Sequence, residues 1–178
     1  MQVVVNNAGF GVFGEFTKTE LRSETDMINV NIVAVHTLMK LFLRDFIKRD
    51  SGYILNVASS AAFLPGPLLA AYYATKAYVY RLTIAVEKEL TKKKSNVHLS
   101  VLCPGPVQTE FNKRAGVKFA VKGITSEYAA KYAVEKMFEG KVTIIPELPI
   151  KIGLIGAKLL PQCILTEFAY RFQMKKRG

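Results

Sequence analysis

The sequence predicts an α/β fold in which a doubly wound parallel sheet is covered by helices. Short apolar runs with β-branched residues are each followed by a longer stretch whose apolar residues recur at steps of three and four, the pattern of strand and helix in alternation. Helices of this length between strands give right-handed crossovers and parallel strands. The chain has 178 residues, of which 50% are hydrophobic, so we expect residues 1–178 to form one domain with a hydrophobic core.

The N-terminal part contains one predicted strand and one long predicted helix. Residues 3–5 are three valines, a β-branched run that suits a strand buried on both faces. Residues 19–49 are predicted to be helical, because apolar side chains follow one helix face. These side chains are Ile28, Ile32, Val35, Met39, Phe42 and Phe46. Thr17 and Glu20 have the spacing of a capping box at the start of this helix, and residues 51–52 end it.

The rest of the chain repeats the alternation. Strands are predicted at residues 53–57, 97–103 and 142–145. Helices are predicted at residues 70–93 and 126–138, the latter capped by Thr125 or Ser126, and as one or two segments within residues 146–178. In open parallel sheets, ligands bind at the carboxyl ends of the strands. We therefore expect function in the loops after Val5, Val57 and Cys103.

Composition and charge exclude several classes of protein. The net charge of +11 is densest at residues 92–94 and 175–177, which we interpret as a solvated helix end and a soluble tail, so no nucleic-acid partner is expected. Cys103 and Cys163 have neither metal-ligand spacing nor a disulfide framework, which predicts no metal site and a reducing, cytoplasmic location. The first residues lack the pattern of a signal peptide, and no run reaches the ~18 uninterrupted apolar residues of a membrane span.

One group of residues indicates carbonyl chemistry. Tyr72 and Lys76 are four residues apart in a predicted helix, so both project from one face. An ammonium beside a phenol favours the phenolate and lowers the pKa of the phenol toward working pH, so the phenol can give a proton to an alkoxide or take one from an alcohol. Ser59 follows the second predicted strand, and its hydroxyl can hold a carbonyl oxygen as charge grows on it.

Two other motifs are interpreted more simply. Residues 9–14 match the pattern G-x-G-x-x-G after a strand, but no helix starts directly and no acidic strand residue follows at the required distance. We interpret this segment as a loop whose glycines allow close approach of the backbone. Tyr132 and Lys136 form a second Y-x-x-x-K pair without a serine-bearing strand end before it, and we interpret them as ordinary helix surface.

Together and in this order, these residues resemble the short-chain dehydrogenase/reductase family, over residues 3–111. The resemblance rests on five segments, namely Asn6-Asn7-Ala8-Gly9, Asn29-Val30-Asn31-Ile32, Asn56-Val57-Ala58-Ser59, Tyr72-Tyr73-Ala74-Thr75-Lys76 and Cys103-Pro104-Gly105-Pro106-Val107-Gln108-Thr109. Ser59 stands thirteen residues before Tyr72, the usual gap in the family, and Ser60 is the rival one residue away. The fold implied is a partial Rossmann-like sheet, the C-terminal half of the family's domain.

The resemblance implies an NAD(P)-dependent oxidoreductase that interconverts a carbonyl compound and its secondary alcohol by hydride transfer. Tyr72 would be the acid/base, and Lys76 would lower its pKa and hold the nicotinamide ribose. Ser59 would fix the carbonyl oxygen, and Asn31 would hold a water that resupplies protons through Lys76. The implied contacts to the cofactor, NADP or NAD, are Asn7, Ala8, Gly9, Tyr72, Lys76, Pro104, Gly105, Val107 and Thr109.

Residues 106–125 and 146–178 are expected to cover a small-molecule substrate. Their apolar side chains suit an aliphatic or ring-bearing carbonyl compound. These side chains are Phe111, Val117, Phe119, Val121, Leu148, Ile150 and Ile152. The family begins with a Gly-rich strand–turn–helix that holds the cofactor pyrophosphate, and the resemblance implies that this half is missing here. The first strand would then have an open edge.

A second hypothesis stays open beside the first. The chain is then a truncated, non-catalytic fragment that acts as a dimerising or membrane-surface module. The basic residues 175–177 of its amphipathic tail would make weak contact with lipid. Under the first hypothesis we expect an enzyme that forms a homo-oligomer.

Overall fold

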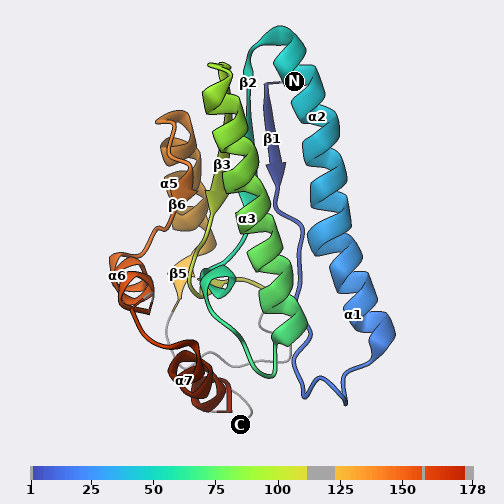
Figure 1. Ribbon diagram of the computed structural model, residues 1–178, viewed down its shortest axis with the longest axis vertical. Coiled ribbons are helices and arrows are strands. Elements are labelled where there is room, and N and C mark those ends of the chain that lie inside the picture. The colour runs from blue at the N-terminus through green and yellow to red at the C-terminus, as the bar shows by residue number, and fades with distance from the viewer. Residues whose placement is uncertain (1, 112–122, 158, 175–178) are drawn as a thin grey trace.

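The computed structural model describes residues 2–111, 123–157 and 159–174, which form a parallel sheet with helices on both faces (Figure 1). The sheet has the order β1-β2-β3-β6, and all neighbouring strands are parallel. The strands are Val3–Asn6 (β1), Gly52–Val57 (β2), Val97–Leu102 (β3) and Thr143–Ile144 (β6). The predicted α/β class with a parallel sheet is therefore confirmed.

The helices begin and end close to the predicted positions. They are Leu21–Ile28 (α1), Val35–Arg49 (α2), Ala70–Lys92 (α3), Ser126–Phe138 (α5), Leu148–Ala157 (α6) and Gln162–Met174 (α7). A π-helical segment, Asn29–Ala34 (η1), joins α1 to α2 without a break. In Figure 1, α7 lies at the end of the molecule toward which β1 points, so the C-terminal helices are near the carboxyl ends of the strands.

Two local predictions about the long helix are wrong. The capping box of Thr17 and Glu20 does not form, since α1 begins directly after Glu20 and this N-cap residue makes no side-chain capping hydrogen bond. Residues 51–52 do not end the helix. Asp50 ends it by adopting the left-handed conformation with φ 46°, and Gly52 is already the first residue of β2.

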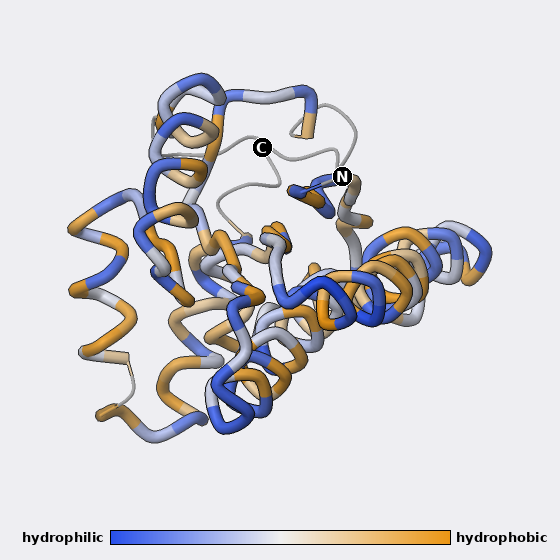
Figure 2. The backbone as a smooth tube through the Cα atoms, turned by 90° about the horizontal axis from the view of Figure 1, so that it is seen from above, coloured by the Kyte–Doolittle hydropathy of each residue, from blue (hydrophilic) through white to orange (hydrophobic). Residues whose placement is uncertain are grey.

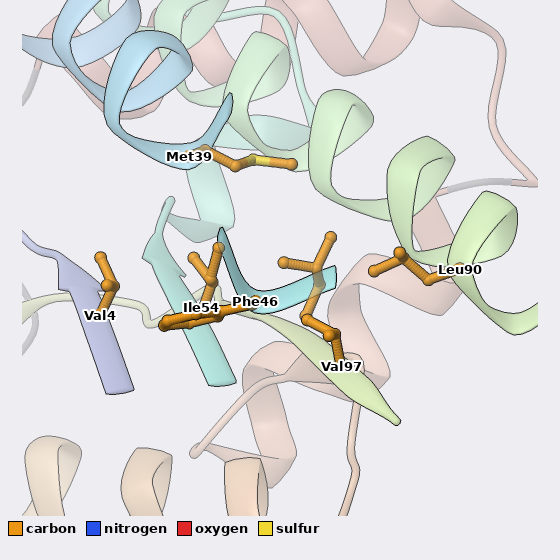
Figure 3. Close-up of a cluster of buried hydrophobic side chains, with 7 residues drawn as sticks. Val4, Met39, Phe46, Ile54, Leu90 and Val97 are labelled. Atoms are coloured by element: carbon orange, nitrogen blue, oxygen red, sulfur yellow. The ribbon is translucent and has the colours of Figure 1, made fainter. Parts of the chain in front are cut away.

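Hydrophobic side chains fill both faces of the sheet, because neighbouring residues of a strand point to opposite faces. Figure 3 shows the cluster between the strands and the helices α2 and α3, which consists of Val4, Met39, Phe46, Ile54, Leu90, Val97 and Leu99. On the other face, Ala133 and Met137 of α5 pack against Leu55 and Ile144. Apolar and polar residues alternate along the helices in Figure 2, as expected for helices that bury one side.

The helical stretch Leu21–Arg49 has 29 residues and is long and apolar enough to cross a membrane by length and composition. One side of it packs on the sheet and on α3 through Val35, Met39 and Phe46, which are buried. The core helix of a soluble protein passes the same test, so this feature is weak support for a membrane span.

Candidate active site

Four residues that the sequence singles out lie at the carboxyl ends of β1 and β2. Ser59 follows β2, Tyr72 and Lys76 come from α3, and Asn31 comes from η1. Ser59, Tyr72 and Lys76 line one cavity of about 930 Å³, which is large enough for a small molecule. The cavity extends to residues of α6 and α7.

Ser59 and Tyr72 both line the cavity, and the Ser59 side chain lies close enough to Tyr72 to lower the pKa of its phenol. Ser59 is also the N-cap of the 3₁₀ helix Ser60–Phe63 (η2), and its Oγ accepts a hydrogen bond from the backbone N–H of Ala61 at 3.1 Å. Because this bond uses an oxygen lone pair, the hydroxyl hydrogen of Ser59 remains available as a donor. Between Ser59 and its rival Ser60, Ser59 is the one whose side chain lowers the pKa of Tyr72.

Lys76 lies beside Tyr72, as the helical spacing predicts, with its Nζ 5.8 Å from the centre of the Tyr72 ring. The ammonium is almost fully buried and donates to the carbonyl oxygen of Val57 at 2.9 Å. Burial lowers the pKa of Lys76 to about 8, and the nearby Cys103 opposes this shift. An ammonium has three N–H donors, so the bond to Val57 leaves capacity for a ligand.

The pKa of Tyr72 shifts in the direction opposite to the predicted one. Burial raises the pKa of Tyr72 to about 12, and the nearby Ser59 side chain offsets only part of the rise. The Tyr72 ring packs against Phe111, with centroids 5.2 Å apart, and edge-on to Tyr73, with centroids 6.1 Å apart. The prediction that Lys76 lowers this pKa is therefore wrong for this structure, because desolvation dominates and the opposing effect comes from Ser59. Near pH 7 the phenol is neutral and can donate a proton.

Asn31 is buried in η1, and its side chain binds the backbone of Phe10 through both ends of the amide. Its Nδ2 donates to the Phe10 carbonyl oxygen at 2.9 Å and to the Thr75 hydroxyl at 3.0 Å, and its Oδ1 accepts from the Phe10 N–H at 3.1 Å. A Cβ atom at Gly9 would lie 3.0 Å from Asn31 Oδ1 and 3.1 Å from Lys76 Nζ. Glycine at this position therefore lets the N-terminal loop approach both polar side chains closely.

Most of the predicted cofactor contacts surround the same cavity. Its wall includes Asn7, Gly9, Tyr72, Lys76, Pro104, Gly105, Val107 and Thr109. Ala8 is exposed and is not among the described wall residues. The Pro-Gly loop leads into a second parallel sheet, of Val107–Gln108 (β4) and Ile124–Thr125 (β5), which the sequence does not predict. Glu147 accepts from the Gly105 N–H at 3.1 Å, which ties this loop to the start of α6.

Three polar residues of the site are missing from the sequence-based prediction. They are Thr75, Glu147 and Gln173. Thr75 lies one residue before Lys76 inside the Y-x-x-x-K segment, and its position there could have marked it. Glu147 stands alone among apolar residues, and a lone polar residue in such a segment is the signal that could have found it. Gln173 stands close to Arg171 and Lys175 in the sequence and has no such signal.

The second Y-x-x-x-K pair forms part of the surface of α5. Lys136 Nζ makes an ion pair with Glu139 at 2.7 Å and lies 5.7 Å from the centre of the Tyr132 ring. Neither Tyr132 nor Lys136 is among the described residues that line the cavity. This pair therefore provides an internal control for the pair of Tyr72 and Lys76.

Part of the expected substrate cover is described. Phe111 and Ile150 line the cavity, whereas Leu148 and Ile152 are exposed. Other expected residues lie outside the described part of the chain, and they are Val117, Phe119, Val121 and the basic residues 175–177. Within residues 2–111, 123–157 and 159–174, no cluster of His, Cys, Asp and Glu could hold a metal ion.

Comparison with known proteins identifies the family to which the chain belongs. The sequence model for short chain dehydrogenases matches residues 1–119. The ketoacyl reductase HetN of Nostoc sp. is 32% identical over 160 residues, and the match covers 86% of this chain and 54% of HetN. The chain spans about half the length of the curated relatives it matches.

Solved structures share the fold. A short-chain dehydrogenase from Sphingobium yanoikuyae in complex with NADPH has a TM-score of 0.78 at 24% identity, over 89% of this chain and 63% of that one. A short chain dehydrogenase/reductase from Burkholderia phymatum in complex with NAD has a TM-score of 0.77 at 21% identity, over 86% of this chain and 63% of that one. At these identities the likeness concerns the fold. Because the family's sequence model also matches more than half of the residues, the chain belongs to the short-chain dehydrogenase family.

Proposed function

We propose that this protein is an NAD(P)-dependent oxidoreductase that interconverts a carbonyl compound and its secondary alcohol by hydride transfer. The observation that carries the proposal is the neutral phenol of Tyr72 beside Ser59, in the wall of a cavity that the buried Lys76 also lines. Family membership and the NADPH and NAD complexes of the two structural neighbours support a nicotinamide cofactor. The choice between NADP and NAD stays open.

The described residues fit the nicotinamide side of such a cofactor. Lys76 has donors beyond its bond to Val57, and these suit the ribose hydroxyls. Gly9 and Gly105 both line the cavity, so their backbones form part of the surface that a flat ring would meet. The remaining proposed contacts are Asn7, Ala8, Pro104, Val107 and Thr109, of which the exposed Ala8 has the weakest support. The cofactor, when bound, gives a hydride to the carbonyl carbon or takes one from the alcohol carbon.

In the reducing direction, the chain's own residues manage the oxygen. The Ser59 hydroxyl donates to the carbonyl oxygen and holds it beside Tyr72. As charge grows on that oxygen, the Tyr72 phenol transfers its proton to it, and the carbonyl oxygen becomes the alcohol oxygen. The nearby Lys76 ammonium then stabilises the phenolate. We propose that Asn31 holds the water that returns a proton through Lys76, using the second lone pair of its Oδ1.

Replacement of Tyr72 tests this mechanism. We predict that Tyr72→Phe lowers kcat about 10²- to 10⁴-fold, because the proton donor is lost. The affinity for NADPH or NADH, measured by nicotinamide fluorescence, should change little. Tyr132→Phe alters the second Y-x-x-x-K pair, outside the cavity wall, and should keep full turnover. Turnover retained in Tyr72→Phe would contradict the role of Tyr72.

A second candidate is a non-catalytic module that dimerises or lies at a membrane surface. Apolar side chains on the C-terminal helices support it, since Ile152, Ile155 and Phe168 are 61%, 58% and 64% exposed. One comparison separates the two candidates. No fluorescence change with NADPH or NADH, together with pelleting on anionic liposomes that high salt reverses, would favour the module. Nicotinamide binding without lipid-dependent pelleting would favour the oxidoreductase.

We further propose a cytoplasmic location and a homo-oligomer. Cys103 and Cys163 are free thiols, which fits a reducing compartment. The homo-oligomer is supported by the apolar outer side of α2, where Leu38 and Leu41 are exposed.

A further inference from the structure

The cavity wall contains a second polar pair, apart from the residues that handle the reacting oxygen. Gln173 of α7 is only 1% exposed, and its Nε2 donates to the Tyr73 hydroxyl at 2.7 Å. The other end of the amide, Oε1, is buried and has no hydrogen-bond partner among the described residues. Both Gln173 and Tyr73 line the same cavity as Tyr72.

An unpaired amide oxygen at this position needs an explanation. Native proteins pair nearly all buried polar groups, because a group that loses water without gaining a partner destabilises the fold. Among the described residues, Gln173 Oε1 is the one buried side-chain polar atom without a partner. Since Gln173 belongs to a cavity wall and not to the closed core, a ligand that turns its side chain toward the cavity can supply the missing donor.

The pair can both accept and donate. The Tyr73 oxygen accepts from Gln173, and burial raises the pKa of Tyr73, so its phenol keeps a hydrogen that a ligand can accept. The same argument holds if the amide oxygen and nitrogen of Gln173 exchange places. The oxygen then accepts from the Tyr73 hydroxyl, and the nitrogen is the unpaired group, which can donate to a ligand. A ligand hydroxyl is donor and acceptor at once, and it is therefore complementary to either arrangement.

The surroundings of this pair are apolar, and the pair is close to the proposed proton donor. Tyr73 follows Tyr72 in α3, and the two ring centroids are 6.1 Å apart. The apolar part of the wall includes Leu69, Phe111, Ile150, Leu165, Phe168 and Phe172. A ligand with its carbonyl at Tyr72 would thus have its carbon skeleton along apolar side chains before it reaches Gln173.

We propose that Gln173 and Tyr73 bind a hydroxyl group of the substrate, and that the substrate class is a hydroxyketone, or the corresponding diol, with an apolar skeleton between its two oxygens. This inference rests on the proposed oxidoreductase function and adds the substrate class to it. Gln173 is then a residue that determines specificity, because it binds a part of the substrate that does not react.

The test uses two ketones with one skeleton, benzylacetone and its para-hydroxylated derivative. We expect the unmodified protein to prefer the hydroxylated ketone in kcat/KM. In Gln173→Met, which keeps the side-chain length and removes both polar groups, kcat/KM for the hydroxylated ketone should fall about ten- to a hundredfold, mainly through KM. The value for benzylacetone should change less than about twofold. Tyr73→Phe, which removes the other partner, should reduce the same preference.

Two other kinetic outcomes overturn the proposal, and a third is decided by a binding measurement. Equal losses for both ketones in Gln173→Met, with a lower melting temperature, would mean that Gln173 only ties α7 to α3. Equal kcat/KM of the unmodified protein for the two ketones would mean that the pair does not read a hydroxyl. If neither ketone is turned over, the oxidoreductase function fails for these ketones, and calorimetric binding of the same two ketones then decides the inference. Tighter binding of the hydroxylated ketone, lost in Gln173→Met, would support it, and equal binding would refute it.

Discussion

At Tyr72 and Lys76, burial favours the neutral form of both side chains. It raises the pKa of the Tyr72 phenol to about 12 and lowers the pKa of the Lys76 ammonium to about 8. Below pH 8 the site therefore has a neutral phenol beside a cation, which is the state that a proton donor and its supporting charge require. Because both shifts come from burial, the pH dependence of stability reports on them directly.

We predict that Lys76→Met changes this pH dependence. The unfolded chain keeps the lysine proton up to a pKa of 10.5, whereas the folded protein releases it near pH 8. Between these values the unfolded state binds more protons, so this lysine makes the free energy of unfolding rise with pH, and below the window its contribution is constant. Methionine does not titrate. The unfolding free energy of the unmodified protein minus that of Lys76→Met should therefore increase from pH 8 to pH 10.5.

Urea unfolding at several pH values between 7 and 10 measures this difference. Lys131→Met, at an exposed position of α5, controls for the loss of a surface charge. A difference between the unmodified protein and Lys76→Met that stays constant across this range would show that burial does not shift the lysine.

Local spacing predicts some of these residues and not others. Tyr72 and Lys76 are neighbours because a helix brings residues four apart together. Ser59 lies close to them because it follows β2, a strand against which α3 packs. The direction of the Tyr72 pKa shift could not be predicted, since it depends on how completely the assembled cavity removes water. Gln173 lies one hundred residues beyond its partner Tyr73, and no local pattern relates two such positions.

Among the elements, the stretch from α1 to α2 shows what periodicity can and cannot predict. Apolar residues at steps of three and four predict a long helix with one buried side, and the burial of Val35, Met39 and Phe46 follows that pattern. The pattern does not reveal that Asn29–Ala34 is π-helical, because one wider turn alters the periodicity only locally. Yet this turn contains Asn31 and places it against the N-terminal loop.

The junction of α2 and β2 gives a prediction about stability. Gly52 has φ 151°, and a Cβ atom there would lie 2.3 Å from Cδ2 of the Phe46 ring. The Phe46 side chain is 1% exposed, so it cannot move aside without disturbing the core. We predict that Gly52→Ala lowers the free energy of unfolding by about 2–4 kcal/mol, through backbone strain and overpacking together.

Chemical denaturation followed by circular dichroism measures this effect. Gly153→Ala is the matched control, because Gly153 is exposed within α6 and a Cβ atom there meets nothing within 4 Å. Alanine at this helix position should stabilise the protein by up to about 1 kcal/mol. If Gly52→Ala were as stable as the unmodified protein, the contact between Gly52 and Phe46 could not be as tight as the structure has it.

For the whole molecule, the alternation of strands and helices predicts a parallel sheet, and the C-terminal helices are harder to predict. β1 lies at the edge of the four described strands, where Val5 is 50% exposed. In α6, Ile150 lines the cavity while Ile152 is exposed, although both are equally apolar in sequence. Which of them meets the cavity depends on how α6 packs near η2, and that packing is a property of the tertiary structure.

The outer side of η1 and α2 leads to a prediction about assembly. Val33, Leu38 and Leu41 are 51%, 41% and 57% exposed on a helical stretch whose opposite side packs on the sheet. Exposed apolar side chains grouped on one surface are typical of an interface between proteins.

We predict a homo-oligomer through this surface, and a glutamate there would be buried without a partner. Leu41→Glu should therefore reduce the mass measured by light scattering to that of one chain, whereas Leu159→Glu, at a position 85% exposed between α6 and α7, should leave it unchanged. A single-chain mass for the unmodified protein would contradict the interface.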